Sequence, residues 1–478
     1  MKTKEILNNL KFIEVVGEIP EKINEVKIDS KNVKNGDCFV AIKGEKLDGH
    51  SFIDEAYKNG ASLFIVEREI DRKPYIKVSD TRLALARISS NFYNNPSSQM
   101  KIFGITGTNG KTTTAFLLKS IYKDATLLTT IGYFIKDEFL KGLNTTPDSL
   151  TINKILYDSL QKGVKTAIME VSSHSVVQKR VEFIDFKFGI FTNLTRDHLD
   201  YHKTFEAYRD AKASFFSKLD ENSFAILNYD DPSTEYIIQK TKSKIITYGL
   251  NGGNIQGEII NSSINGLNMI IRGMGIEVKI NSPLIGRHNA SNILAAFSSA
   301  IMNGKDIERI KEGIESFRGV KGRLEKIDLG QPFNIFIDYA HTPDAMVNVI
   351  SSVKELSKGS VTVIFGAGGN RDKGKRKLMG MVAEHLADRI ILTSDNPRDE
   401  EPVEIIKMIA EGIENKKYEV IEDRKEAIRF GIKTSKPDDT ILILGKGHED
   451  YQEIKGKRIP FSDYDVVVEI LKEEKYET

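Results

Sequence analysis

The stretch KIFGITGTNGKTTTAFLL, residues 101–118, limits the possible folds of this chain more than any other stretch. An apolar run leads into a turn bounded by Gly107 and Gly110, and an amphipathic helical pattern follows at once. Backbone N–H groups in such a turn and in the first helical turn converge on one point, where the helix dipole also favours negative charge. The stretch therefore predicts a phosphate-binding loop within an α/β domain.

This loop is shorter than the strict P-loop pattern G-x-x-x-x-G-K-[ST], because Ile105 stands at the position of the first glycine. An ordinary strand-to-helix turn, in which the two glycines serve only the backbone geometry, is the alternative. The strand before the loop and the helix after it favour a nucleotide site. In that site Lys111 would contact the terminal phosphates and Thr112 would offer its hydroxyl to Mg²⁺.

Length and composition limit the class of protein. At roughly 150 residues per domain, 478 residues predict about three domains. The formal charge of +1 gives no reason to expect a nucleic-acid or membrane partner. Cys38 is the only cysteine, so no intramolecular disulfide can form, and no apolar stretch has the length of a signal peptide or a membrane span. We expect a cytoplasmic protein.

Hydrophobic patterning divides the chain into three α/β units. Residues 1–98 carry short apolar runs and predict a small N-terminal domain. In residues 99–323 strand-like and helix-like segments alternate, which predicts a central nucleotide-binding domain with a parallel sheet. The same rhythm restarts in residues 324–478 and predicts a doubly wound, Rossmann-like domain. Its loop GAGGNRDKG is no dinucleotide fingerprint, because Arg371 replaces the last glycine.

Polar residues that follow apolar runs are the candidates for chemistry, because ligands bind beyond the carboxyl ends of parallel strands. Glu170 ends the run TAIME and could hold Mg²⁺ opposite Thr112, although a strand-end glutamate can also be merely solvated. His198 and His202 are four residues apart and could share a helical face; the glutamate of H-E-x-x-H is missing, and a packed or surface histidine is the alternative. By pattern alone, Lys212 is an ordinary helix lysine.

Two polar loops of the third domain, SDNPRDEEP and GKGHEDYQ, also follow apolar runs and are expected at one sheet edge. Arg371 and Arg398 can each pair with a carboxylate, and Glu449 can accept from an ammonium group. A ligand with both charges, an amino acid, suits this set. The alternative is a pair of solvated loops in which Pro397 and Gly447 are only turn residues.

Several motifs together resemble the Mur ligase family of peptidoglycan synthesis, and they run in family order from Ile28 to Tyr451. They are GTNGKTTT, NTTPDS, MEVSSHSVVQKR, FTNLTRDHLDYH, RHNASN, DYAHTPD, GGNRDKGKR, DNPRDEEP and GKGHEDYQ. The chain is most similar to the members that add the third amino acid to the UDP-linked precursor. The resemblance implies an N-terminal domain for the UDP group, a central ATPase and a C-terminal domain for the incoming amino acid. ATP would convert the glutamyl carboxylate into an acyl phosphate, which the amine of the amino acid attacks.

Site roles follow from the resemblance, position by position. Lys111, Glu170, His198 and Lys212 would be catalytic. Thr112 and Glu170 would hold one Mg²⁺, and Glu170, His198 and a carbamate on Lys212 a second. ATP would contact Gly107, Thr108, Asn109, Gly110, Lys111, Thr112, Thr113, Asn289, Arg323 and Asp338. The UDP-N-acetylmuramoyl dipeptide would contact Ile28, Ser30, Asn144, Thr145, Thr146, Ser172, Gln178 and Arg180. The loop Glu45-Lys46-Leu47 carries other residues than relatives do, so its contacts stay open.

The incoming amino acid would contact Arg371, Asp395, Asn396, Pro397, Arg398, Gly445 and Glu449. Members with arginine at the fourth position of DNPR use meso-diaminopimelate, whose distal carboxylate pairs with the guanidinium, so Arg398 predicts this substrate. Meso-lanthionine presents the same two ends, and L-lysine is a further alternative. A folylpolyglutamate synthetase and an ATP-driven switch are rival functions. We expect a monomer.

Overall fold

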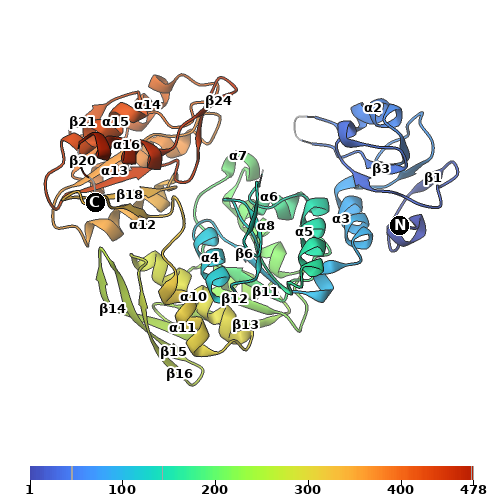
Figure 1. Cartoon of the computed structure of the whole chain (residues 1–478), viewed down its shortest axis with the longest axis horizontal. Coiled ribbons are helices and arrows are strands. Elements are labelled where there is room, and N and C mark those ends of the chain that lie inside the picture. The colour runs from blue at the N-terminus through green and yellow to red at the C-terminus, as the bar shows by residue number, and fades with distance from the viewer. Residues whose placement is uncertain (45–46, 143, 475, 477–478) are drawn as a thin grey trace.

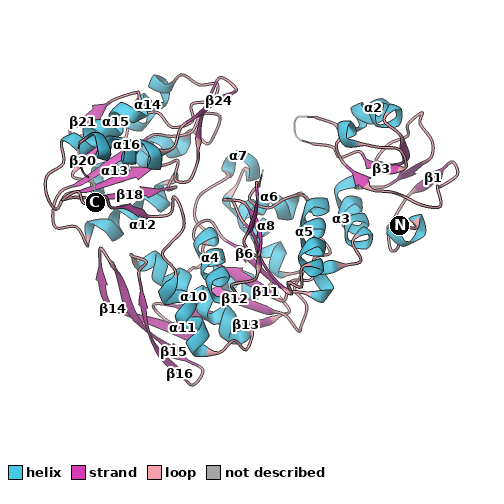
Figure 2. Cartoon of the chain, in the orientation of Figure 1, coloured by secondary structure: helices cyan, strands magenta, loops and turns pink. Residues whose placement is uncertain are grey.

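The computed structural model describes residues 1–44, 47–142, 144–474 and 476. Three α/β lobes follow one another along the chain, and each is built around its own sheet (Figure 1). In Figure 2 helices flank the strands in every lobe. The predicted fold class, α/β with a parallel central sheet and a doubly wound C-terminal sheet, is confirmed. The boundaries at residues 98/99 and 323/324 stay a prediction.

The N-terminal lobe has a sheet of five strands in the order β1-β5-β4-β3-β2, parallel except for β1. Cys38 is buried in β3, as the apolar run CFVAI indicates. The strands are β1 (Glu14–Val16), β2 (Val26–Lys27), β3 (Asp37–Val40), β4 (Ala61–Val66) and β5 (Tyr75–Lys77), and the helices are α1 (Thr3–Ile6), α2 (Ile53–Lys58) and α3 (Thr81–Phe92), with 3₁₀ turns at Ser30–Asn32, Gly49–Phe52 and Pro96–Gln99.

The central sheet has eleven strands in the order β16-β15-β14-β13-β12-β11-β6-β10-β7-β8-β9. Its strands are β6 (Lys101–Thr106), β7 (Thr126–Leu128), β8 (Tyr133–Ile135), β9 (Glu138–Leu140), β10 (Thr166–Glu170), β11 (Phe188–Phe191), β12 (Phe224–Asn228), β13 (Lys244–Gly249), β14 (Ile255–Ser263), β15 (Gly266–Gly273) and β16 (Ile276–Ser282). The helices are α4 (Lys111–Ile121), α5 (Ser149–Gln161), α6 (Ser173–Val177), α7 (Leu199–His202), α8 (Phe205–Phe216), α9 (Ser233–Ile238), α10 (Arg287–Met302) and α11 (Ile307–Ser316).

Strand β6 shows why this lobe is layered. Phe103 and Ile105 pack into the core beneath α4, α10 and α11, whereas Ile102 packs into the core beneath α5 and α8. Alternate side chains of a strand point to opposite faces, so both faces of β6 are covered by helices. The neighbours β10 and β11 run parallel to β6, and the carboxyl ends of all three strands therefore meet at one edge.

Both ends of the central sheet carry antiparallel strands that the sequence interpretation missed. Asn265-Gly266 is a hairpin signal at the turn between β14 and β15. Met274 and Gly275, between β15 and β16, both have positive φ, 54° and 79°, as a tight hairpin turn requires. In Figure 1 strands β14, β15 and β16 lie below α12.

The C-terminal lobe has six strands in the order β17-β18-β22-β19-β20-β21, parallel except for β17. Its strands are β17 (Glu325–Ile327), β18 (Asn334–Asp338), β19 (Val361–Phe365), β20 (Arg389–Leu392), β21 (Tyr418–Val420) and β22 (Thr440–Leu444), with the ribbon β23 (Tyr451–Ile454) and β24 (Lys457–Pro460) beside them. Helices α12 (Pro343–Lys354), α13 (Gly374–Leu386) and α14 (Pro402–Ala410) cover one face, and α15 (Arg424–Lys433) and α16 (Asp463–Glu473) cover the other.

Candidate functional site

The loop between β6 and α4 has the geometry of an anion cradle. Gly107 and Gly110 have φ of 151° and 83°, values that other residues rarely adopt. A Cβ atom on Gly107 would lie 1.9 Å from Thr192 Oγ1, and one on Gly110 would lie 2.3 Å from Asn292 Oδ1. Both glycines therefore serve close packing as well as backbone conformation, and the N-terminus of α4 opens directly behind them.

Asn193 holds this loop from the end of β11. Its Oδ1 accepts from the backbone N–H of Asn109 at 2.8 Å, and its carbonyl oxygen accepts from the N–H of Thr108, also at 2.8 Å. Its Nδ2 donates to the Asn109 carbonyl at 3.2 Å. The sequence interpretation missed Asn193, although its position just after the strand FGIF could have indicated it.

Two lysines, the partly buried Lys111 and the buried Lys212, contact the loop on its inner side. Lys111 Nζ donates to the carbonyl oxygens of Gly107 at 2.9 Å and Thr108 at 2.7 Å. Lys212 Nζ, from α8, donates to the same Gly107 oxygen at 2.8 Å. Burial lowers the pKa of both ammonium groups, and the charge of Lys111 lowers the pKa of Lys212 further. Lys212 is thus no ordinary surface lysine, which its helical pattern did not reveal.

Oxygen ligands gather at the carboxyl end of β10. Glu170, fully buried, accepts from Thr112 Oγ1 at 2.9 Å and from Thr130 N and Oγ1 at 3.1 and 3.2 Å. Thr112 and Glu170 thus lie together, as a shared magnesium ion would require. Among the described residues no three His, Cys, Asp or Glu side chains form a group that could hold a metal ion.

The expectation that His198 and His202 share a helical face is wrong. His198 has a φ of 54° and precedes α7, so it is the cap of that helix and not part of its face. His174 lies between the two, with its ring centroid 4.9 Å from that of His198 and 5.6 Å from that of His202. Burial lowers the pKa of His198, and the nearby Asp197 carboxylate opposes this shift.

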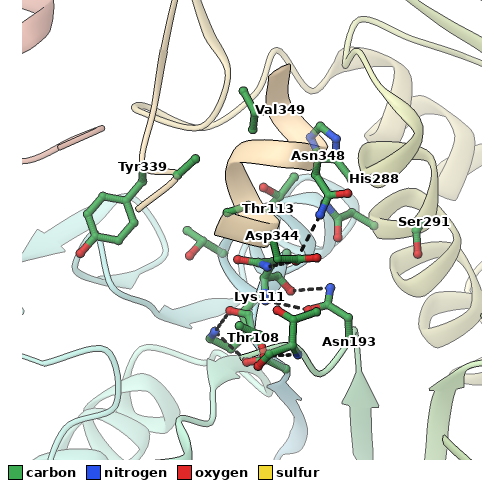
Figure 3. A pocket seen from close by; sticks show the side chains of 18 of the residues that line it. Thr108, Lys111, Thr113, Asn193, His288, Ser291, Tyr339, Asp344, Asn348 and Val349 are labelled. Atoms are coloured by element: carbon green, nitrogen blue, oxygen red, sulfur yellow. Dashed lines mark hydrogen bonds between the residues drawn. The ribbon is translucent and has the colours of Figure 1, made fainter. Parts of the chain in front are cut away.

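A cavity of about 570 Å³ joins these groups between the central lobe and α12 of the C-terminal lobe (Figure 3). Asn109 Nδ2 donates to Asp344 Oδ2 of α12 at 3.1 Å, so the loop is tied to the C-terminal lobe. The predicted residues that line the cavity are Gly107, Thr108, Asn109, Gly110, Lys111, Thr112, Thr113, Thr145, Glu170, Ser172, His198, Lys212, Asn289, Arg323 and Asp338. Residues that the sequence interpretation missed also line it, among them Asn193, Asp197, Tyr208, His288 and Asp344.

Arg323 and Asp338 enter the cavity from the junction with the C-terminal lobe. The Arg323 guanidinium lies over the Tyr339 ring, 4.6 Å from its centroid, and Nη2 is 3.4 Å from Thr112 Oγ1. Asp338 ends β18 and accepts from the N–H groups of Leu324 and Ala340 at 2.6 and 2.7 Å. Burial raises the pKa of Asp338, which these bonds partly offset.

The predicted contacts to the UDP-linked substrate fall into two groups. In the central lobe Thr146 Oγ1 donates to the Glu170 carbonyl at 2.8 Å, and Arg180 Nη1 donates to the Thr146 carbonyl at 2.8 Å. Arg180 also bonds to Gln178, and the Asn144 carbonyl accepts from Tyr133. These residues therefore continue from Glu170 toward the N-terminal lobe, where Arg82 Nη1 lies 3.4 Å from Gln178 Oε1.

Ile28 and Ser30 do not line the cavity. Ser30 Oγ donates to Glu55 within the N-terminal lobe, and Ile28 is partly exposed. The structure therefore does not bring these two residues together with the central set. Of the loop Glu45-Lys46-Leu47, the first two residues lie outside the described part of the chain, and Leu47 is exposed.

The two polar loops of the C-terminal lobe lie against each other, as expected from their strands. Asn396 Nδ2 donates to Glu449 Oε2 at 2.7 Å, and a Cβ on Gly445 would lie 2.4 Å from Asp395 Oδ2. Burial and the charge of Asp395 raise the pKa of Glu449. Lys446, missed by the sequence interpretation, is fully buried here, with Nζ 3.3 Å from Asn396 Oδ1 and from Glu449 Oε2.

Arg398 and Arg371 differ in how they are held. Arg398 has a φ of 52°, Nη1 donates to the Gly369 carbonyl at 2.6 Å, and Nε lies 3.3 Å from Glu453 Oε2. Arg371 is exposed and its side chain takes part in none of the hydrogen bonds or ion pairs found among the described residues. Pro397, in the same loop as Arg398, packs against the loop that carries Arg371, since its carbonyl oxygen lies 1.9 Å from the place of a Cβ on Gly369.

Known proteins match this chain along almost its whole length. Residues 105–300 match the Mur ligase middle domain, residues 322–447 the Mur ligase glutamate ligase domain, and residues 22–93 the Mur ligase family catalytic domain. A protein of Phocaeicola vulgatus is 41% identical, over 99% of this chain and 100% of its own length. The chain belongs to the Mur ligase family.

A second relative, from Bacteroides fragilis, is 42% identical over 98% of this chain and 99% of its own length. Both relatives are named UDP-N-acetylmuramoyl-L-alanyl-D-glutamate--2,6-diaminopimelate ligase. A solved structure of a ligase with that name has a TM-score of 0.69 and 31% identity, covering 99% of both chains. The MurF ligase of Thermotoga maritima in complex with ADP, 20% identical with a TM-score of 0.67 over 94% of this chain and 97% of its own, shares the fold. No helix in the described ranges has the length and apolarity to cross a membrane.

Proposed function

We propose that this Mur ligase adds meso-diaminopimelate to UDP-N-acetylmuramoyl-L-alanyl-D-glutamate in the synthesis of peptidoglycan precursors. The observation that carries the proposal is full-length identity of about 40% to ligases named for this reaction. The geometry supports it in two places: an anion cradle at the central cavity and a charged pair of loops at the C-terminal sheet edge. The predicted cytoplasmic location, monomeric state and role in cell growth and division belong to the same proposal.

ATP fits the central cavity. The loop of Gly107 to Lys111 and the N-terminus of α4 suit its phosphates, and the space between Asn289, His288 and Asp344 suits the rest of the nucleotide. Lys111 would lie against the terminal phosphates, and Arg323 would approach them from the lobe junction. The solved T. maritima relative that holds ADP has the same fold, which supports this placement.

Mg²⁺ fits the oxygen set at the carboxyl end of β10. Thr112 and Glu170 would hold one ion, and Glu170, His198 and a carbamate on Lys212 would hold a second. The ions would neutralise phosphate charge as the phosphoryl group moves. A carbamate would turn Lys212 from a cation into an anionic oxygen ligand, and the lowered pKa of its amine favours the neutral form that reacts with carbon dioxide.

The chemistry divides into two transfers. The D-glutamyl carboxylate oxygen bonds to the γ-phosphorus of ATP, the bond to the β–γ bridging oxygen breaks, and ADP leaves. The amine of the amino acid then attacks the acyl carbon, the C–O bond to phosphate breaks, phosphate leaves with the electron pair, and the amine loses a proton. Thr145, Thr146, Ser172 and Arg180 would hold the acceptor beside Glu170.

At the C-terminal edge, Glu449 and Asp395 would bind the ammonium end of the amino acid, and Arg371 and Arg398 would bind its carboxylates. Arg398 favours meso-diaminopimelate over L-lysine, because lysine has no distal carboxylate for the guanidinium to pair with. Meso-lanthionine has the same two ends and stays an alternative. A folylpolyglutamate synthetase and an ATP-driven switch are the remaining rivals.

A competition experiment tests the proposal. The purified protein is given ATP, Mg²⁺ and the UDP-linked dipeptide, with equimolar meso-diaminopimelate, meso-lanthionine and L-lysine, and the products are weighed by mass spectrometry. We expect the diaminopimelate adduct to dominate. A lysine adduct would support the ligase activity but contradict the proposed role of Arg398 in selecting the amino acid. Phosphate release that needs neither acceptor nor amino acid would favour the switch.

A further inference from the structure

The two arginines assigned to the amino acid stand on different loops. Arg371 belongs to the glycine-rich loop (residues 366–373, between β19 and α13), and Arg398 belongs to the DNPR loop (residues 393–401, between β20 and α14). Recognition of a ligand with carboxylates at both ends depends on the distance between two guanidinium groups. The feature that fixes one loop against the other therefore matters for selectivity.

Direct contacts join the two loops at their tips. The N–H of Gly369 donates to the Asn396 carbonyl at 2.9 Å, and Arg398 Nη1 donates to the Gly369 carbonyl at 2.6 Å. Asn370 Nδ2 donates to Asp399 Oδ2 at 2.6 Å. Of these contacts only the Asn370–Asp399 bond is exposed to water, whereas Gly369 and Asn396 are buried and the Arg398–Gly369 bond is partly buried.

An ion pair between the fully buried Arg376 and the partly buried Glu400 also joins the two loops. Arg376, in the first turns of α13, donates through Nη1 and Nη2 to the two carboxylate oxygens of Glu400 at 2.8 and 2.9 Å. Nη2 also lies 3.2 Å from the Gly368 carbonyl of the glycine-rich loop. Glu400, in the DNPR loop, accepts in addition from the N–H of Asn370 at 2.7 Å. The pair thus connects Asn370, the residue before Arg371, with Glu400, two positions after Arg398.

Arg376 cannot itself touch a ligand, because none of its side chain is exposed. A guanidinium and a carboxylate that meet through two parallel bonds fix both distance and orientation, which a lysine or an amide cannot reproduce. Loss of the Glu400 charge would leave a buried cation uncompensated, so the loops would move to find another partner or water. Both residues lie in motifs of the sequence, GGNRDKGKR and DNPRDEEP, yet neither has a contact role in the reaction.

We propose that Arg376 and Glu400 are positioning residues that set the spacing of Arg371 and Arg398, and through it the selectivity for an amino acid with a distal carboxylate. The inference rests on the proposed function, because it presumes that the two arginines bind the amino acid. It goes beyond that function by assigning selectivity to a pair that lies beneath the pocket.

Glu400→Gln and Arg376→Lys test the proposal from both sides, as each keeps the approximate shape of its side chain. KM and kcat are measured for meso-diaminopimelate, L-lysine, ATP and the UDP-linked dipeptide. In both variants we expect the KM for diaminopimelate to rise about 10-fold or more, with those for ATP and the dipeptide changing by less than about 2-fold. The preference for diaminopimelate over lysine in kcat/KM should fall.

Ile470→Val is the matched control. Ile470 is fully buried in α16, on the other face of the same sheet, so its truncation weakens the lobe without touching either loop. It should lower the thermal midpoint and leave every KM unchanged. Unchanged diaminopimelate KM in both loop variants, or equal rises for all substrates, would overturn the inference. A wild-type protein that ligates no diamino acid would instead overturn the proposed function, and the inference with it.

Discussion

Lys111 and Lys212 donate to one and the same carbonyl oxygen, that of Gly107, at 2.9 and 2.8 Å. Two ammonium groups that converge in a buried space repel each other, and burial adds to the cost of charging both. The pKa of Lys212 is lowered for these two reasons. A lowered pKa raises the share of neutral amine at Lys212, and the neutral amine is the form that can react with carbon dioxide.

Replacing Lys212 tests whether this amine becomes an anionic ligand. Lys212→Ala should lower kcat for ligation by roughly 100-fold or more while leaving the circular dichroism spectrum unchanged, because the second magnesium ion loses a ligand. Short-chain acids such as formate or acetate should restore part of the activity by supplying the missing carboxylate. Lys218→Ala, a surface lysine just after α8, is the control. Full activity of Lys212→Ala would falsify the carbamate role.

The magnesium requirement should depend on Glu170. Glu170→Gln keeps the size of the side chain that accepts from Thr112 and Thr130, but it removes the charge. We expect the Mg²⁺ concentration for half-maximal ligation to rise about 10-fold or more, because a neutral amide is a weaker ligand for a hard cation. Glu182→Gln, which removes a partly buried carboxylate that pairs with Lys218 elsewhere in the same lobe, serves as control. An unchanged magnesium dependence would remove Glu170 from the ligand set.

The sequence predicted the site residues that lie at the ends of strands, and it missed the contacts that depend on packing between distant segments. The loop from Gly107 to Lys111 was predicted from two glycines between a strand-like and a helix-like stretch, and Glu170 from its place at the end of an apolar run. The parallel pairing of β6 and β10 brings both to one edge of the sheet. Thr145 and Ser172 were predicted from the family resemblance, and both line the same cavity. The contact of Lys212 with Gly107 spans 105 residues of sequence, and no local periodicity encodes it.

Two errors have specific physical causes. The prediction that His198 and His202 share a helical face was wrong because His198 has a left-handed backbone conformation just before α7. The spacing of side chains in the sequence cannot reveal such a conformation. The antiparallel strands at the sheet ends were missed because interpretation followed the alternation of strands and helices and passed over Asn265-Gly266. Asp344 could not be placed either, since its bond to Asn109 depends on how two lobes meet.

Arg398 should control the use of the amino acid and not the use of ATP. Arg398→Ala should raise the KM for meso-diaminopimelate by roughly 100-fold and change the KM for ATP by less than about 2-fold, because a carboxylate of the ligand loses its charged partner. Steady-state kinetics with each substrate varied in turn measures both. Arg429→Ala, on the outer face of α15, is the control. Equal changes in the two KM values would refute the assignment.

A buried ion pair of the C-terminal lobe should govern stability. Arg424 and Asp463 are both fully buried and bond through Nε and Nη2 at 2.7 and 2.8 Å, and Nη2 also reaches the Leu444 carbonyl at 3.0 Å. Asp463→Asn leaves a buried guanidinium uncompensated, which should cost about 3–5 kcal/mol. The free energy of unfolding of this lobe alone is measured by hydrogen exchange in urea, followed in peptides from β18, β19 and β22.

The exposed pair Lys425–Glu469 of the same two helices is the comparison for Asp463→Asn. Removing its charge by Glu469→Gln should cost no more than about 1 kcal/mol, since water screens the partners. Similar losses in the two variants would mean that Asp463 contributes no more than a surface charge.

The Glu400 carboxylate should make stability depend on pH in one direction. Hydrogen bonds from Arg376 lower its pKa from 4.5 to about 2, so the folded protein holds the ionised form more strongly than the unfolded chain does. Its contribution is therefore complete above about pH 4.5 and is lost as the pH falls toward 2. The thermal midpoint of the wild type minus that of Glu400→Gln should be constant from pH 8 to 5 and shrink at pH 4 and 3. A difference that stayed constant down to pH 3 would show that Glu400 acts through its shape alone, because only the charged form is sensitive to this range of pH.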